Sequence, residues 1–308
     1  MAINLVCALP VLIWNWQHGW ITVRHVAGDA KAGAGWSPAV LDFLGSQALL
    51  LNPIFFIGMI WAAIAFWRRS RRAPKLVFLF CMGAPLFLVY LLYSFHSSIQ
   101  PNWIAPSVLP LFCLMVGYWD TRLRLGSKPV KIALLAGLAL GLPVVIVAHD
   151  TELIAKFTGH RLPVNKDPLH RARGWREVAG LVQADRRELL TEGKPVFVIA
   201  AHYRLAAEIS FYMADAQARN SEKPLVYCRR SAVPVDQFYF WPGYSSDSRQ
   251  GQNALFVMEL DRDDPRPKNA PASLLKEFDS VNDLGIREVM DHGRVLWRLQ
   301  FFACRGLK

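Results

Sequence analysis

The sequence lacks the short motifs that mark several large enzyme classes. It contains no G-x-S-x-G elbow, no Walker A loop, no H-E-x-x-H pair and no G-x-G-x-x-G fingerprint. The sequence therefore gives no grounds for a serine hydrolase, a P-loop NTPase, a zinc protease or a Rossmann-type dehydrogenase.

Cysteine is scarce, and its spacing indicates no metal or redox site. No two of the five cysteines form a C-x-x-C pair: Cys7, Cys81, Cys113, Cys228 and Cys304. Three of them lie in apolar runs, which is typical of buried and inert thiols. A disulfide between Cys228 and Cys304 stays open if the C-terminal half lies outside the cytoplasm.

The net charge of +11 is not accompanied by a recognisable nucleic-acid-binding motif. We therefore expect no nucleic-acid partner. The excess positive charge is better explained by membrane-flanking loops and by a basic surface that attracts anionic lipid headgroups.

Four long apolar stretches fill the first half of the chain, at residues 43–67, 76–95, 103–119 and 132–148. Each carries few or no charges and approaches the ~17–25 residues that a helix needs to cross a bilayer. A shorter apolar stretch at residues 2–16 resembles a crossing that has lost its beginning. The sequence thus predicts about five membrane crossings in residues 1–149.

Basic residues lie in two of the loops between these stretches. These residues are Arg68, Arg69, Arg71, Arg72 and Lys75 in one loop, and Arg122, Arg124, Lys128 and Lys131 in the other. The loop at residues 96–102 has no Lys or Arg. The positive-inside rule then places both basic loops in the cytoplasm and residues 150–308 outside it.

Residues 150–308 have the composition of a soluble domain and alternate between strand and helix patterns. Apolar runs at residues 196–200, 225–228, 254–260, 286–289 and 295–302 predict strands, the last two joined by a turn at 291–293. Helices are expected from Trp175, over residues 205–214 and over 271–278. This order predicts an α/β sandwich with a mixed sheet.

The apolar stretches hold no ionisable residue that we place at mid-depth, which argues against a proton-coupled transporter. Polar side chains gather instead near the expected outer surface: His18, Arg24, His25, Asp29, His96, Gln100 and Asn102. Such a surface suits a lipid-linked substrate whose headgroup lies there while its tail stays in the bilayer.

Several segments resemble bacterial family 39 glycosyltransferases, the aminoarabinose-transferase-like and protein-mannosyltransferase-like enzymes that use polyprenyl-phosphate sugars. In the apolar half these are residues 10–15 (PVLIWN), 47–53 (QALLLNP) and 100–103 (QPNW) with Pro106. In the soluble half they are residues 174–175 (GW), 202–203 (HY), 211–212 (FY) and 237–241 (QFYFW). The resemblance covers nearly the whole chain.

The resemblance implies a GT-C membrane architecture in a bacterial inner membrane, with a periplasmic C-terminal domain. A hexosyl or pentosyl group would pass from a polyprenyl-phosphate donor to a lipid or glycan acceptor outside the cytoplasm. In the family a carboxylate deprotonates the acceptor, and a divalent metal or basic residues hold the donor phosphate. No metal ligand is assigned in this chain.

The chain departs from the family because no segment matches the external loop that carries the catalytic aspartate. We do not assign that role to Asp29 or Asp42, which lie in a later loop. The catalytic residue is therefore unknown, and we expect this chain to be the C-terminal part of such an enzyme and inactive alone. The alternative is a non-catalytic, membrane-anchored module that binds glycans or lipids or assists assembly.

Two groups of candidate substrate-binding residues follow. On the outer face, hydrogen bonding and stacking on a sugar or phosphate headgroup suit four residues: His96, Gln100, Asn102 and Trp103. In the soluble domain, an acceptor groove with aromatic walls would use five: His202, Tyr203, Gln237, Tyr239 and Trp241. An ordinary capped turn and an ordinary domain core remain the respective alternatives.

Overall fold

The computed structural model divides the chain into two compact units, Met1–Ala148 and His149–Lys308. It describes residues 2–29, 38–69, 73–217, 224–231, 234, 236–245 and 249–308, and only the backbone of residues 2–5, 29, 69 and 217. Arg71 and Arg72 of the first basic loop lie outside these residues. The predicted fold class is confirmed, because long apolar helices precede a domain with a mixed five-stranded sheet and helices.

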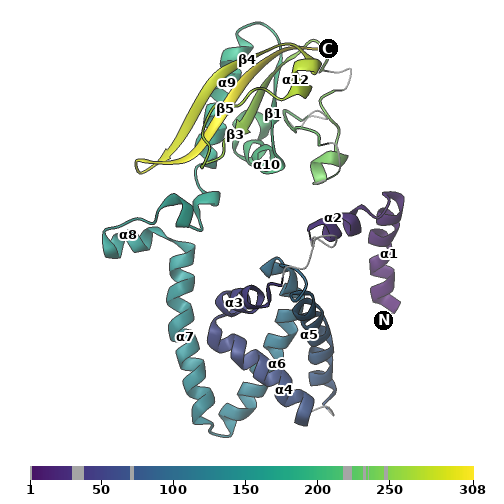
Figure 1. Cartoon of the computed structure of the whole chain (residues 1–308), viewed down its shortest axis with the longest axis vertical. Helices are drawn as coiled ribbons and strands as arrows, with labels where there is room; N and C mark the ends of the chain where they lie inside the picture. Colours follow the sequence, from purple (N-terminus) through teal and green to yellow (C-terminus); the bar gives the residue numbers. More distant parts are fainter. Residues whose placement is uncertain are drawn as a thin grey trace. The chain divides into compact units, whose positions relative to one another are not determined.

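The first unit is built from helices (Figure 1). They are α1 (Ala2–Gln17), α2 (Ile21–Asp29), α3 (Val40–Leu51), α4 (Pro53–Arg69), α5 (Pro74–Tyr93), the short 3-10 helix η1 (Pro101–Ile104), α6 (Ala105–Arg124) and α7 (Lys128–His149). Helices α4, α5 and α6 pack together around a core that includes Met59, Phe87 and Leu114.

Fewer helices can cross a membrane than the sequence predicted. Among the described residues, three are long and apolar enough, or four if the bent pair α3–α4 counts as one span. The expected number was about five. The difference arises at α1, whose 16 residues rise only about 24 Å, short of the roughly 30 Å hydrocarbon core.

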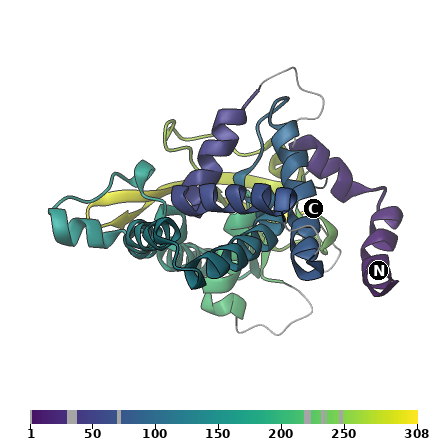
Figure 2. The ribbon, with the colours of Figure 1, turned by 90° about the horizontal axis from the view of Figure 1, so that it is seen from below.

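The stretch at residues 43–67 was expected as a single span with a kink at Asn52-Pro53, and the structure breaks it at Asn52. Helices α3 and α4 meet there at 108° (Figures 1 and 2). Asn52 has a φ of 70°, a left-handed conformation that asparagine tolerates better than most residues. Its side chain accepts a hydrogen bond from the Ile54 amide and donates one to the Gly137 carbonyl of α7, at 3.0 and 2.8 Å. The break is thus held by specific hydrogen bonds.

Glycines let the helices of this unit approach one another closely. A Cβ added at Gly83 of α5 would lie 2.6 Å from the Leu111 side chain and 2.7 Å from the Ser107 carbonyl oxygen of α6. At Gly58 of α4 it would lie 2.5 Å from Trp119. Small residues at such contacts are typical of membrane helices, which associate mainly by close packing.

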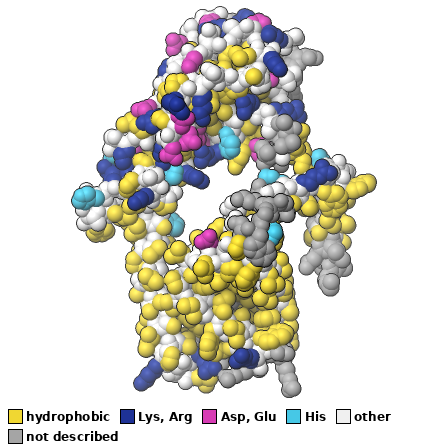
Figure 3. Space-filling model, viewed as in Figure 1, with side chains coloured by type: hydrophobic (Ala, Val, Ile, Leu, Met, Phe, Trp, Pro, Cys, Tyr) yellow, Lys and Arg dark blue, Asp and Glu magenta, His cyan; other side chains and the backbone are white. Residues whose placement is uncertain are grey.

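The outward surface of these helices is strongly apolar (Figure 3). Exposed leucine, valine and isoleucine side chains cover α7, among them Ile132, Leu142 and Ile146. Lys and Arg side chains lie at the end of the unit where α6 and α7 meet (Figure 3). An apolar band of this size is characteristic of a surface that contacts lipid.

The second unit begins with short helices, α8 (Glu152–Thr158), η2 (Val164–Lys166) and η3 (His170–Ala172). The elements that follow are α9 (Trp175–Leu190), β1 (Val196–Ala200), α10 (Tyr203–Tyr212), α11 (Ala214–Gln217), β2 (Val226–Cys228), η4 (Gln237–Phe240), β3 (Asn253–Glu259), α12 (Ala272–Glu277), β4 (Phe278–Asp291) and β5 (Arg294–Leu307). The predicted strands are all present, and the last two are longer than expected.

The sheet has the order β2-β1-β3-β5-β4. Strand β1 is parallel to β2 and β3, whereas β5 is antiparallel to β3 and β4. All residues of β1 are buried, as expected for a central parallel strand covered on both faces. Helices α9 and α10 pack against each other and against β1.

The possible disulfide between Cys228 and Cys304 is not formed, and both thiols are free. Cys228 ends β2 and Cys304 lies in β5, so two strands separate them. Three strand spacings amount to about 14 Å, well beyond the roughly 7 Å that a disulfide allows between Cα atoms.

Candidate functional site

The outer-face candidates lie in the connection between α5 and α6. Gln100 and Asn102 are exposed, whereas His96 and Trp103 are half-buried. The Trp103 ring lies 6.5 Å from the ring of Tyr90, and the His96 ring lies 5.8 Å from that of Tyr93. The structure therefore brings the four residues into one short segment, with two amide side chains on its surface.

Helix α3 anchors this segment. The side chain of Gln47, which is buried, donates a hydrogen bond to the Pro101 carbonyl at 2.8 Å. The Ala39 amide donates another to the Ser94 carbonyl at 2.8 Å. The backbone of this segment is thus held at Ser94, where it begins, and at Pro101, between Gln100 and Asn102.

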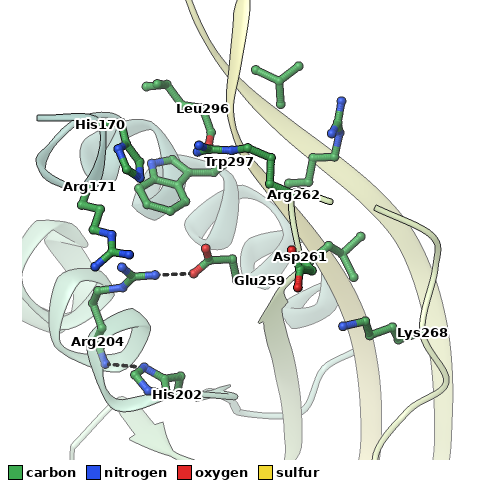
Figure 4. Close-up of a pocket in the computed structure, with 13 residues that line it drawn as sticks. His170, Arg171, His202, Arg204, Glu259, Asp261, Arg262, Lys268, Leu296 and Trp297 are labelled. Atoms are coloured by element: carbon green, nitrogen blue, oxygen red, sulfur yellow. Dashed lines mark hydrogen bonds and ion pairs between the residues drawn. The ribbon is translucent and has the colours of Figure 1, made fainter. Parts of the chain in front are cut away.

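The second unit contains a cleft of about 510 Å³ at the carboxyl ends of β1 and β3, which we call the β1–β3 cleft (Figure 4). Its lining comes from His170 and Arg171 of η3, His202 and Arg204 at the start of α10, residues 259–262 with Lys268, and residues 295–298 of β5. From β1 the chain passes through α10 to β2 on one side, while β3 lies on the other. Parallel strands form ligand crevices at such switch points.

Arg204 is held at the floor of the β1–β3 cleft by several contacts. Its guanidinium forms an ion pair with Glu259 at 2.6 Å (Figure 4). The same group lies 5.6 and 5.4 Å from the ring centroids of Trp175 and Trp297. His202 caps α10 by accepting the Arg204 amide on its Nδ1 at 3.3 Å. These contacts fix the direction of the Arg204 side chain.

Buried side chains also position the other segments around the β1–β3 cleft. The Trp175 indole donates a hydrogen bond to the Arg171 carbonyl at 2.7 Å. Gln300, which is fully buried, accepts the Lys268 amide at 2.8 Å and donates to the Lys268 carbonyl at 3.0 Å. Residues 261–268 have the sequence of a solvated loop, but the backbone of Lys268 at its end is hydrogen-bonded to Gln300 of β5.

A smaller cavity of about 210 Å³ lies between β2, α12 and the segment after η4. Trp241, Phe238 and Tyr244 contribute to its mostly apolar lining. The Tyr244 hydroxyl donates to Glu277 at 2.7 Å, and burial together with this carboxylate raises the pKa of Tyr244. Burial also raises the pKa of the Cys228 thiol to about 11, which makes it a poor nucleophile at neutral pH.

The five candidates of the soluble domain do not share one groove. His202 lines the β1–β3 cleft, and Trp241 lines the smaller cavity. Gln237 and Tyr239 belong to η4 and line neither of these two cavities, and Arg230 stacks over the Tyr239 ring at 5.2 Å. Tyr203 is 44% exposed and packs against the His202 ring at 4.1 Å.

Sequence reasoning missed most of the charged residues of the β1–β3 cleft. Arg171 belongs to a basic run and Glu259 lies in an expected strand, so the sequence contained a partial indication that these two residues could belong to a site. Lys268 gave none, because its position depends on the hydrogen bonds to Gln300.

One group of side chains has the composition of a metal site. Ligand atoms of Glu152, Asp291 and His292 lie within 4.8 Å of one another. However, Arg294 contacts Asp291 at 2.9 Å, and Arg173 contacts Glu152 at 3.2 Å. These guanidinium groups already neutralise the carboxylates, so the cluster is an ion-pair network between α8 and the β4–β5 hairpin.

The chain is similar to the lipid A galacturonosyltransferase RgtD of Rhizobium johnstonii, with 26% identity over 250 residues. The match covers 78% of this chain and 47% of the relative, so the chain spans about half the length of that curated relative. Because 250 residues exceed either unit, the similarity extends into both. No protein-family model matches the chain. No solved structure matches it.

Proposed function

We propose that this chain is part of a membrane glycosyltransferase of the GT-C type. It would serve the transfer of a sugar from a polyprenyl-phosphate donor to a lipid or glycan acceptor outside the cytoplasm. The observation that carries the proposal is the similarity to a lipid A galacturonosyltransferase across both units. The proposal places the chain in a bacterial inner membrane with the α/β unit in the periplasm. The charge distribution of the loops supports this orientation.

The donor headgroup would bind at the segment between α5 and α6. This segment has no charged residue between His96 and Trp103. Its neutral hydrogen-bonding groups include the amide side chains of Gln100 and Asn102. Both are exposed on an anchored backbone. The Trp103 ring is half-buried and belongs to the class of side chains that stack on sugars and favour the membrane interface.

Cross-linking to a photoreactive polyprenyl-phosphate sugar tests this site. The purified chain in nanodiscs should be labelled, and the substitutions Asn102→Ala and Trp103→Ala should each reduce labelling about fivefold or more, because each removes a hydrogen bond or a stacking surface. Trp67→Ala is the matched control. Trp67 lies near the last residue of α4 and outside the segment between α5 and α6, so this variant should be labelled as strongly as the unmodified chain. Full labelling of both test variants would exclude the segment as the donor site.

The same preparation tests catalysis. We propose that the isolated chain binds the donor without transferring its sugar, because transfer needs a positioned general base and neither Asp29 nor Asp42 is assigned that role. The measurement is the transfer of labelled sugar from the donor to lipid A, the acceptor in the name of the relative. Turnover by the purified chain would refute this part of the proposal and leave the donor site intact.

A further inference from the structure

The β1–β3 cleft has more positive charge than its own carboxylates can neutralise. Its cationic side chains are Arg171, Arg204, Arg262, Lys268 and Arg298, and its carboxylates are Glu259 and Asp261. Two of the cations are already matched, since Arg204 pairs with Glu259 and Arg298 pairs with Glu288 outside the cleft. Among the described residues, this leaves three cations against Asp261.

The three unmatched cations reach the cleft from two segments, η3 and the loop after β3. Arg171 comes from η3, Arg262 follows β3, and Lys268 lies at the far end of that loop. Figure 4 shows Arg171 and Arg204 extending toward the same space, with Glu259 facing them from β3. Arg262 donates to the Leu296 carbonyl at 3.3 Å and has no carboxylate partner among the described residues. Such convergence of cations from several directions suits an anion with several oxygens.

We propose that the β1–β3 cleft binds a phosphate monoester. A phosphate monoester carries about −1.5 to −2 charges at neutral pH, which matches the excess of three cations over one carboxylate. The volume of about 510 Å³ is in the range of small-molecule sites and exceeds what an isolated phosphate requires. The surplus of arginine disfavours a metal cation in this cleft.

Two sources could supply this group, a water-soluble sugar phosphate or the phosphate of a membrane lipid. Calorimetric titration of glucose 1-phosphate into the full chain, held in phosphatidylcholine nanodiscs, tests the shared chemistry. We expect saturable binding, with uncharged glucose binding at least about tenfold more weakly, because charged hydrogen bonds contribute most of the affinity.

The decisive comparison uses two double variants with equal loss of charge. Arg171→Ala with Lys268→Ala should weaken glucose 1-phosphate binding about tenfold or more. Arg176→Ala with Lys194→Ala removes two exposed cations of the same unit that do not line the cleft, and should leave binding unchanged. Equal weakening in both variants, or no binding to the unmodified chain, would overturn the proposal.

Nanodiscs that contain phosphatidic acid distinguish the two sources, with phosphatidylglycerol nanodiscs as the control for surface charge. Competition by phosphatidic acid alone supports a lipid phosphate as the occupant. Unchanged affinity supports a water-soluble sugar phosphate. Because these experiments measure binding and not transfer, their result is independent of whether the chain is part of a glycosyltransferase.

Discussion

Glu259 neutralises one cation of the β1–β3 cleft, since its carboxylate lies 2.6 Å from Arg204. Glu259→Gln keeps the size of the side chain and a hydrogen-bond acceptor but removes one negative charge. We expect glucose 1-phosphate to bind roughly threefold to tenfold more tightly, because Arg204 would lose its carboxylate partner and could pair with the phosphate instead. Calorimetry measures this change. Glu208→Gln, on the same helix as Arg204, is the control, and weaker binding in Glu259→Gln would contradict the charge argument.

Asp291 illustrates how a single carboxylate couples the stability of the second unit to pH. Burial favours its neutral form, but hydrogen bonds from His292 and Arg294 outweigh burial and hold the pKa of Asp291 below its usual value. A lowered pKa stabilises the folded state at pH values above the pKa of the unfolded state, about 3.9. This stabilisation is lost as the pH falls through the pKa of the folded state.

The substitution Asp291→Asn should therefore lower the free energy of unfolding by about 1–2 kcal/mol at pH 7. The difference from the unmodified protein should shrink at pH 3, below the unfolded pKa, because protonation of the unfolded carboxylate removes part of this stabilisation. Melting temperatures at the two pH values measure the effect. Asp263→Asn makes the same charge change at an exposed position and should show little effect at either pH.

At the scale of elements, the close contact of α5 with α6 at Gly83 tests how the helices of the first unit associate. Gly83→Ala would place a methyl group against Leu111 and the Ser107 backbone, so we expect α5 and α6 to separate and stability to fall by about 1–3 kcal/mol. Thermal unfolding in detergent measures this loss. The matched control is Gly117→Ala in α6, where the added carbon would meet only Leu76 at 4.0 Å. A melting temperature for Gly83→Ala equal to that of the control would show that the close approach of α5 and α6 does not contribute to stability.

Helices and strands were predictable from the sequence where the pattern of apolar residues is enough to define them. The apolar run at residues 196–200 is β1 without a shift of either end, and the buried face of α9 carries Trp175, Val178 and Val182 as expected. The break between α3 and α4 was not predictable as a sharp bend, because it depends on a hydrogen bond from Asn52 to α7. The β1–β3 cleft was missed for a similar reason, since Arg171 and Lys268 are brought together only by the order of the strands.

At the scale of the whole molecule, the helices fix which loops share a side of the membrane. Helices α5 and α6 are long enough to cross, and they run in opposite directions through the first unit. Arg122 and Arg124 at the end of α6 and Lys128 and Lys131 at the start of α7 flank the α6–α7 connection. The α5–α6 connection carries no Lys or Arg. Because α7 is also long enough to cross, the positive-inside rule predicts that the second unit is exported.

Reporter fusions test this orientation in bacterial cells. Green fluorescent protein after Gly126 should fluoresce, because it folds in the cytoplasm, and alkaline phosphatase after Lys308 should be active, because it needs export. Replacing the four basic residues that flank the α6–α7 connection by glutamine should raise the inverted fraction, since they supply the orienting charge. Replacement of two basic residues beyond the last crossing, Arg176 and Lys194, should leave the orientation unchanged. A fluorescent fusion at Lys308 together with an active phosphatase at Gly126 would place the second unit in the cytoplasm, where it could not meet an extracytoplasmic acceptor.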